Sequence, residues 1–112
     1  MTLLDMLAGS AGRVPDRPAL LFRDRAVTYA ELYAEAQRLG ALLAGLGIRR
    51  GERVAVMLPN VPEFAVAYFG VLAAGASVVP LNPLLKVEEL RYILADSGAA
   101  AMLCLDLSRP LL

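Results

Sequence analysis

The longest apolar stretch of the chain, residues 53–83, contains two β-branched runs separated by a helix-like segment. The first run, RVAVML, is followed by Asn60 and Glu63, which have the spacing of a helix capping box with asparagine in the usual serine or threonine place. The apolar residues that follow predict a helix to about Ala74, ended by Gly75, and the run SVVPL predicts a second strand. Two strands joined through a helix of this length predict a parallel pair with a right-handed crossover.

A transmembrane helix is the alternative interpretation of this stretch, because residues 64–85 contain no charged side chain. About 20 apolar residues are enough to span a bilayer. However, glycines, prolines and polar residues interrupt the run, and its β-branched half lies after the glycine predicted to end the helix. The pattern therefore favours a buried strand–helix–strand unit, with no transmembrane segment.

The N-terminal part of the chain shows shorter patterns. Leu3–Leu7 predicts a short helix rather than a signal peptide, because no basic residue precedes the apolar segment and Asp5 interrupts it. A loop with two prolines is expected over Gly12–Pro18. The segments ALLF and RAVTY, on either side of Arg23 and Asp24, predict a hairpin of two short strands.

A second helix is predicted after the hairpin. Thr28 and Glu31 have the spacing of a capping box, so this helix should begin at Tyr29. Apolar residues then recur at helical spacing and predict one buried stripe, formed by Leu32, Ala36, Leu39, Leu43 and Leu46. Glu35 and Arg38 are expected on the solvent side of the helix, as is Glu31.

The connection GLGIRRG that follows this helix approaches the dinucleotide-binding pattern G-x-G-x-x-G but does not match it. Gly47 and Gly51 are separated by one residue too many, and the segment leads from a helix into a strand, which is the reverse of the required order. Gly47 is therefore interpreted as the glycine that ends the helix, and Gly51 as a turn residue.

The rest of the chain predicts one more helix and one more strand. The segment VEELRYILADSG carries Glu88 and Glu89 near its expected N-terminus and Gly98 at its end, and AAMLCL has the composition of a strand. The order strand, helix, strand, helix, strand predicts an α/β fold, namely an open, largely parallel βαβαβ sheet with helices on its faces. A helix and a β-hairpin precede this sheet.

The composition limits the size and the chemistry of this fold. The 112 residues can form a single domain, 1–112, and 11 basic and 11 acidic residues cancel, which gives no charge argument for a nucleic-acid partner. The apolar fraction, 58%, is high for so small a domain, so we expect more protein to cover part of its surface. The lack of histidine excludes the common catalytic triads and zinc sites. The one cysteine, Cys104, is expected to be a buried thiol in a reducing compartment, the cytoplasm.

The segments TYAEL, GERVAVMLPNVPEF, LAAGASVVPLNP and ELRYILADSGA, in this order and spacing, resemble the N-terminal region of adenylate-forming acyl-CoA synthetases. This is the AMP-dependent synthetase and ligase superfamily, and the fatty-acyl-CoA ligase branch is the most similar. The resemblance covers about Leu3 to Leu105 and implies a partial N-terminal subdomain of that ligase fold. It also implies a two-step reaction, in which a carboxylic acid and ATP form an acyl-adenylate and pyrophosphate, and the thiol of CoA then displaces AMP.

The sequence departs from this family because the motifs for catalysis have no counterpart in it. The only lysine is Lys86, and no glycine-rich loop leads from a strand into a helix, as a phosphate-binding loop must. We therefore expect no catalytic, cofactor-binding or metal-binding residue in this chain. The resemblance implies that ATP, Mg²⁺ and CoA are bound only by the intact enzyme.

Two hypotheses for the function remain. In the first, the chain is the N-terminal portion of an ATP-dependent fatty-acid CoA ligase, inactive alone, and its partner is the missing remainder of that ligase. The nucleotide sequence after the stop codon should then encode the missing phosphate loop. In the alternative, the chain is a non-catalytic α/β interaction module that pairs with another chain through an apolar surface.

Asn60, Tyr68 and Asn82 are the candidate substrate-binding residues, because they are polar groups at or near the strand ends where ligands bind in open α/β sheets. The structural interpretation of each is the stronger one, as a helix cap, a core ring with a bonded hydroxyl and a turn residue. The first hypothesis further predicts that Phe64, Phe69 or their neighbours are unusually exposed. A fully closed core around their helix would count against it.

Overall fold

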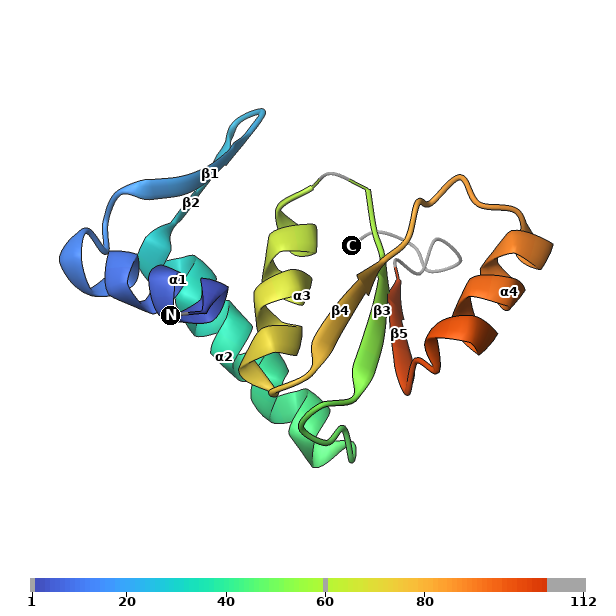
Figure 1. Ribbon diagram of the computed structural model, residues 1–112. Coiled ribbons are helices and arrows are strands. Elements are labelled where there is room, and N and C mark those ends of the chain that lie inside the picture. The colour runs from blue at the N-terminus through green and yellow to red at the C-terminus, as the bar shows by residue number, and fades with distance from the viewer. Residues whose placement is uncertain (1, 60, 105–112) are drawn as a thin grey trace.

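The computed structural model describes residues 2–59 and 61–104. Figure 1 shows how their helices and strands are arranged. In chain order the elements are α1 (Leu3–Arg13), β1 (Pro18–Phe22), β2 (Arg25–Thr28), α2 (Tyr29–Gly45), β3 (Arg53–Met57), α3 (Pro62–Ala73), β4 (Ser77–Pro80), α4 (Val87–Ser97) and β5 (Ala101–Cys104).

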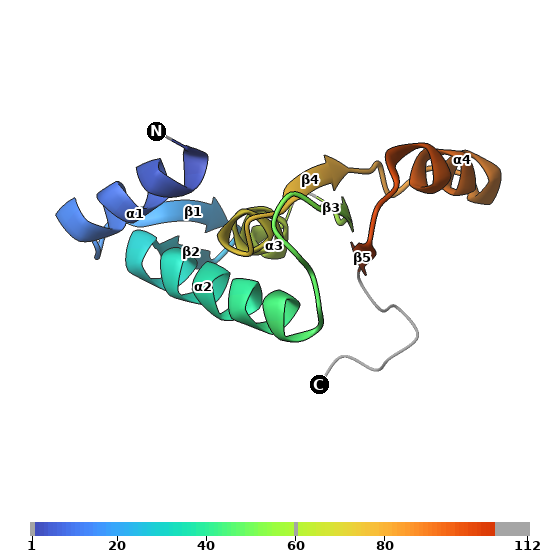
Figure 2. The same ribbon diagram turned by 60° about the horizontal axis from the view of Figure 1, so that its bottom comes forward.

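The central strand of the main sheet is β3. The strand order is β4-β3-β5, and both pairs of neighbouring strands are parallel. Strands β1 and β2 form a separate antiparallel hairpin. In both ribbon views the main sheet lies between α3 and α4 (Figure 1, Figure 2). The predicted parallel βαβαβ sheet, preceded by a helix and a hairpin, is therefore confirmed.

The predicted start of α2 at Tyr29 is also confirmed. The Thr28 hydroxyl accepts a hydrogen bond from the backbone N–H of Glu31 at 3.1 Å, and the Glu31 carboxylate accepts one from the Thr28 N–H at 3.0 Å. Each bond satisfies an N–H group that has no partner within the helix. Gly47, just after the helix, has φ +100°, and Gly51 has φ +86°, values that favour glycine.

Helix α1 is longer than predicted. It continues to Arg13 and begins with a capping box between Thr2 and Asp5 that the sequence analysis did not identify. The helix ends at Arg13. The next residue, Val14, precedes Pro15, and a residue before proline is disfavoured in the helical region of backbone conformation. The loop between α1 and β1 is therefore shorter than the one expected over Gly12–Pro18.

The predicted start of α3 is wrong. The N-cap of α3 is Val61, which makes no side-chain capping bond, and Pro62 is the first helical residue. Proline is favoured at that position because its fixed φ suits a helix and its missing N–H would be unpaired anyway. Asn60 is therefore not the N-cap, and the residue itself lies outside the described ranges.

The core lies where α2 and α3 pack on the central strand. Val54, Ala55 and Val56 of β3 are each 0% exposed, so this strand is covered on both faces. A single apolar cluster joins the strand to the two helices, and its buried members are Leu43, Val54, Val56, Leu58, Ala67, Val71 and Ala76.

Two glycines allow α2 and α3 to approach each other closely. A Cβ atom on Gly40 would lie 2.7 Å from the Cβ of Ala73, and a Cβ atom on Gly70 would lie 2.6–2.8 Å from side-chain atoms of Leu39. Both distances are shorter than carbon–carbon contacts allow. The helix pair therefore depends on the lack of a side chain at these two positions.

Two predictions of burial are wrong. Leu46 is 72% exposed, because α2 ends at Gly45 and the side chain of Leu46 no longer lies in line with the buried stripe of the helix. Cys104 is exposed rather than buried, since it is the last residue of β5, and β5 pairs with β3 on one side at the end of the described sheet order.

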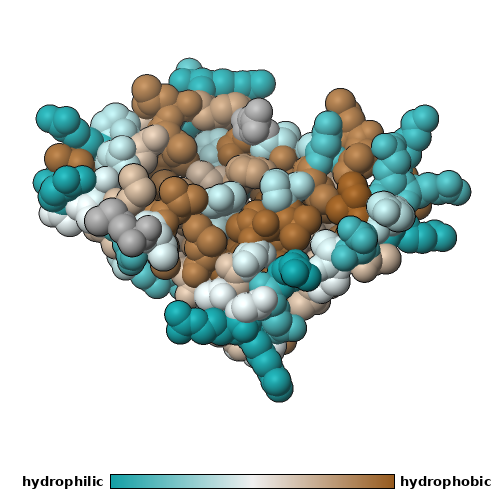
Figure 3. All heavy atoms as spheres, in the orientation of Figure 1, coloured by the Kyte–Doolittle hydropathy of each residue, from teal (hydrophilic) through white to brown (hydrophobic). Residues whose placement is uncertain are grey.

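The surface of α3 is only partly covered. Its buried residues are Pro62, Ala67, Gly70 and Val71, while Phe64 and Phe69 are half-buried. The expected unusual exposure of these two phenylalanines is therefore wrong, but the core around the helix is not fully closed either. Figure 3 shows apolar side chains gathered on the surface over α3 and the sheet, with hydrophilic ones around the periphery.

Helix α4 is the least embedded helix, because it has no buried residue. Strongly exposed apolar side chains occur on it and just before it, namely Leu84, Val87 and Tyr92. No helix within residues 2–59 and 61–104 is long and apolar enough to cross a membrane.

Candidate functional site

The first candidate site is a hollow at the carboxyl edge of the main sheet. Strands β3 and β4 end there side by side, and the chain continues from them into α3 and α4, on opposite sides of the sheet (Figure 1). Open α/β sheets bind ligands where neighbouring strands diverge in this way. The hollow has a volume of about 570 Å³, and Leu58, Phe64, Leu81 and Asn82 are among the residues that line it.

Asn82 is the one predicted site residue that lines this hollow. Its side-chain oxygen accepts a hydrogen bond from the N–H of Leu84 at 2.9 Å, and its carbonyl oxygen accepts one from Leu85 at 3.1 Å. These contacts form a turn between β4 and α4. The side-chain oxygen therefore has a structural partner, while the amide nitrogen takes no part in the turn.

Tyr68 lies on α3 and does not line the hollow. Its half-buried ring packs against those of Phe64 and Phe69, with centroid distances of 6.3 Å and 5.7 Å. Such pairs add to the stability that burial alone provides. The structure thus does not bring Tyr68 and Asn82 together, and Asn60 lies outside the described residues.

The connections at this edge do not fit a nucleotide phosphate. The described residues between β3 and α3 include Pro59, and α3 starts at Pro62, so two backbone N–H groups are missing where a phosphate loop needs donors. Pro83, in the connection after β4, likewise has no backbone N–H to donate to a phosphate. Within the described part of the chain, no group of three or more acidic or cysteine side chains is placed to hold a metal ion.

A second and larger hollow, which the sequence analysis missed, lies between α2 and α3 and has a volume of about 790 Å³. We call it the α2–α3 groove. Its apolar floor is formed by Ala34, Leu39, Val66, Ala67 and Leu103, and its charged rim by Arg25, Glu35, Arg38 and Glu63. The apolar residues on all sides of α3 indicated that part of its surface needs a cover. The sequence did not show that α2 and β5 lie beside α3 and complete the groove.

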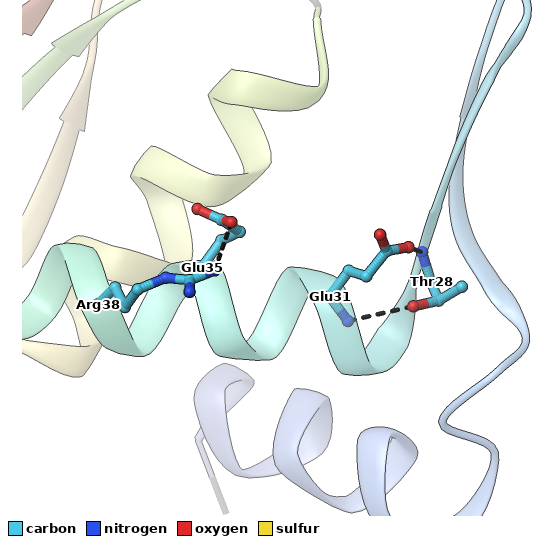
Figure 4. A network of polar contacts seen from close by, with 4 residues as sticks. All are labelled: Thr28, Glu31, Glu35 and Arg38. Carbon is cyan, nitrogen blue, oxygen red and sulfur yellow. Dashed lines mark hydrogen bonds and ion pairs between the residues drawn. The ribbon is translucent and has the colours of Figure 1, made fainter.

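Ion pairs join the charged side chains on the rim. The Nη1 atom of Arg25, on the hairpin, lies 3.0 Å from the carboxylate of Glu63, on α3. Glu35 and Arg38 pair within α2, as Figure 4 shows together with the capping box of that helix. The hydrogen bond from the Thr28 backbone N–H holds the pKa of Glu31 below its ordinary value, and the hydroxyl of Thr28 makes a second, smaller contribution in the same direction.

The hydrogen bond from Arg25 lowers the pKa of Glu63 below its ordinary value of 4.5. The carboxylate therefore stabilises the fold above about pH 4.5, and this contribution is lost as the pH falls through the lowered folded-state pKa. We expect Glu63→Gln to make the acid-side loss of unfolding free energy shallower, by less than about 1 kcal/mol since both partners are half exposed. Urea unfolding between pH 3 and pH 6 would measure it. An equal change with Glu88→Gln, which removes the same charge from α4, would contradict the role of the pair.

Comparisons with known proteins relate nearly the whole chain to one family. A family model described as AMP-binding enzyme matches residues 7–111. The long-chain-fatty-acid–CoA ligase of Bacillus subtilis (strain 168) is 42% identical over 109 residues, which cover 97% of this chain and 20% of the ligase. This chain therefore spans about a fifth of the length of that relative.

Solved structures show the same architecture. The N-terminal subdomain of Klebsiella oxytoca NpsA, in complex with 3-hydroxyanthranilyl-AMSN, is similar with a TM-score of 0.88 and 28% identity, over 95% of this chain and 27% of that one. VinN in complex with L-aspartate is similar with a TM-score of 0.91 and 33% identity, over 96% of this chain and 28% of that one. The arrangement of helices and strands described above is thus found in larger proteins.

Proposed function

Because this chain belongs to the AMP-binding enzyme family, we propose that it is the N-terminal portion of an ATP-dependent fatty-acid CoA ligase. In this proposal residues 1–112 form one unit that supplies scaffold to the ligase and carries no catalytic group. The intact enzyme forms an acyl-adenylate and then an acyl-CoA. Its proposed location is the cytoplasm, and the single cysteine, which cannot form an intramolecular disulfide, is consistent with this.

The observation that carries the proposal is the 42% identity to the Bacillus subtilis ligase along nearly the whole chain. The scaffold role is supported by the carboxyl edge of the sheet, where prolines replace the N–H donors that a phosphate requires. ATP, Mg²⁺ and CoA are accordingly assigned to the part of the ligase outside this chain. The residues of this chain position the strands and helices against which that part packs.

The isolated chain is expected to give no fatty-acid-dependent exchange of pyrophosphate into ATP above a blank. A chimera, in which this chain replaces the matched 109 residues of the Bacillus subtilis ligase, is expected to restore the exchange. Activity of the isolated chain would overturn the scaffold role. A folded but inactive chimera, together with a soluble and monodisperse isolated chain, would favour the interaction module instead.

We propose structural roles for the three candidate residues Asn60, Tyr68 and Asn82. For Asn82, the turn contact to Leu84 supports this role. Asn82→Ala is expected to lower the unfolding free energy of the isolated chain by about 1 kcal/mol, the usual value of one hydrogen bond, and to leave the KM of the chimera for fatty acid unchanged. A raised KM with an unchanged unfolding free energy would instead identify Asn82 as a substrate contact.

A further inference from the structure

The floor of the α2–α3 groove is an apolar surface built from three elements that are distant in sequence. Leu39 of α2, Val66 of α3 and Leu103 of β5 are half-buried, and Ala34 of α2 is exposed. The free energy falls when another apolar surface covers apolar area that was in contact with water. The groove therefore favours an occupant with apolar side chains.

The rim of the groove is suited to such an occupant because its charges are already paired, and the carboxylate of Glu31, which also lines the groove, accepts the hydrogen bond from the Thr28 N–H. Arg25 pairs with Glu63 across the mouth, from the hairpin to α3, and Glu35 pairs with Arg38 along α2 (Figure 4). An apolar segment that covered the floor would leave these four charges with their partners. Covering an unpaired charge would cost far more free energy than covering a paired one at the edge of the groove.

The position of β5 indicates which polypeptide can reach the groove. Leu103 is the second-last residue of this strand and contributes to the groove floor, so a chain that continues past β5 starts beside the groove. In the Bacillus subtilis ligase, the matched residues are 20% of the protein, so most of that polypeptide lies outside the match. A covalently attached segment has a high effective concentration at a site next to its point of attachment.

We propose that the α2–α3 groove is the docking site for the part of the ligase that follows β5. This inference rests on the proposed function, because it assigns the partner of a scaffold. The docked part is apolar where it meets the groove floor and leaves both ion pairs of the rim intact. A second copy of this chain is the competing occupant, and the test below distinguishes the two.

The test compares the solvent accessibility of two cysteines in the isolated chain and in the chimera. With Cys104→Ser as background, Ala34→Cys places a thiol in the groove, and Ala44→Cys places one on an exposed part of the same helix outside it. We expect similar maleimide labelling rates for the two positions in the isolated chain. In the chimera, Ala34→Cys should react about tenfold more slowly, or more, since labelling then requires the docked part to open, while Ala44→Cys should keep its rate.

Equal labelling of both positions in the chimera would overturn the inference. Slow labelling of Ala34→Cys in an isolated chain that elutes as a dimer would also overturn it, in favour of a second copy. The same pair of cysteines, at the aligned positions of the intact Bacillus subtilis ligase, gives the same readout if the chimera does not fold. Labelling does not require catalysis, so an inactive chimera with a protected groove refutes the proposed activity and leaves the docking site standing.

Discussion

Val71→Asp is expected to prevent the chain from folding. Val71 lies in the last turn of α3, is 0% exposed and belongs to the apolar cluster that joins α3 to β3. A carboxylate there would lose its hydration and gain no ion-pair partner, at a cost of several kcal/mol. Small domains are stable by about 5–15 kcal/mol, and for a chain at the low end of this range a loss of this size removes most of the folded population. Circular dichroism and urea unfolding would measure it.

Leu42→Asp provides the matched control for this substitution. Leu42 lies on α2 and is 59% exposed, so the same change of side chain occurs there in contact with water. We expect it to lower the unfolding free energy by only about 1 kcal/mol, because an exposed carboxylate in the last turn of α2 meets the negative end of the helix but keeps its hydration. A cooperative unfolding transition for Val71→Asp, close to that of the unsubstituted chain, would show that α3 does not pack on β3 as described.

Gly40→Ala is expected to destabilise the fold by up to about 2 kcal/mol, although alanine is the better helix former. The gain in helix propensity is about 1 kcal/mol, and overpacking a close contact costs about 1–3 kcal/mol. Overpacking should exceed the gain, because the new Cβ would lie 2.7 Å from the Cβ of Ala73 and 3.2 Å from the α3 backbone. Neither of these atoms can move without shifting the backbone at the C-terminal end of α3.

Gly45→Ala makes the same change in the same helix at a position where, apart from its chain neighbours and the adjacent backbone of α2, no atom lies within 4 Å of the new Cβ. It should therefore stabilise the chain, by up to about 1 kcal/mol. Urea unfolding of both variants, with unchanged dependence on urea concentration, would separate the packing effect from the propensity effect. Equal stabilisation by the two substitutions would contradict the close approach of α2 and α3.

The candidate sites were predictable only in part. Asn82 and the strand ends were identified because polar residues stand out in apolar motifs, and the structure places Asn82 at the hollow beside β3 and β4. The α2–α3 groove was missed, since its rim joins Arg25 and Glu63, which are 38 residues apart. A contact of that kind follows from the packing of the hairpin on α3, and no local pattern encodes it.

Local errors arose where tertiary or backbone constraints outweighed a correct motif. Asn60 and Glu63 have the spacing of a capping box, but Pro62 takes the first helical position, so the helix starts one residue later than this motif predicts. Glu63 pairs with Arg25 of the hairpin instead. Leu46 follows the helical spacing of the stripe, yet the helix ends before it, and the side chain is exposed.

The apolar stretch at residues 53–83 shows what each level determines. Its β-branched runs, helix-like middle and bounding glycines were sufficient to predict a parallel strand–helix–strand unit, because these signals act through neighbouring residues. The strand order β4-β3-β5, the contact of α2 with α3 through Gly40 and Gly70, and the groove beside that contact were decided by tertiary packing. Packing depends on which surfaces fit at van der Waals distance, and residues far apart in the sequence set that fit together.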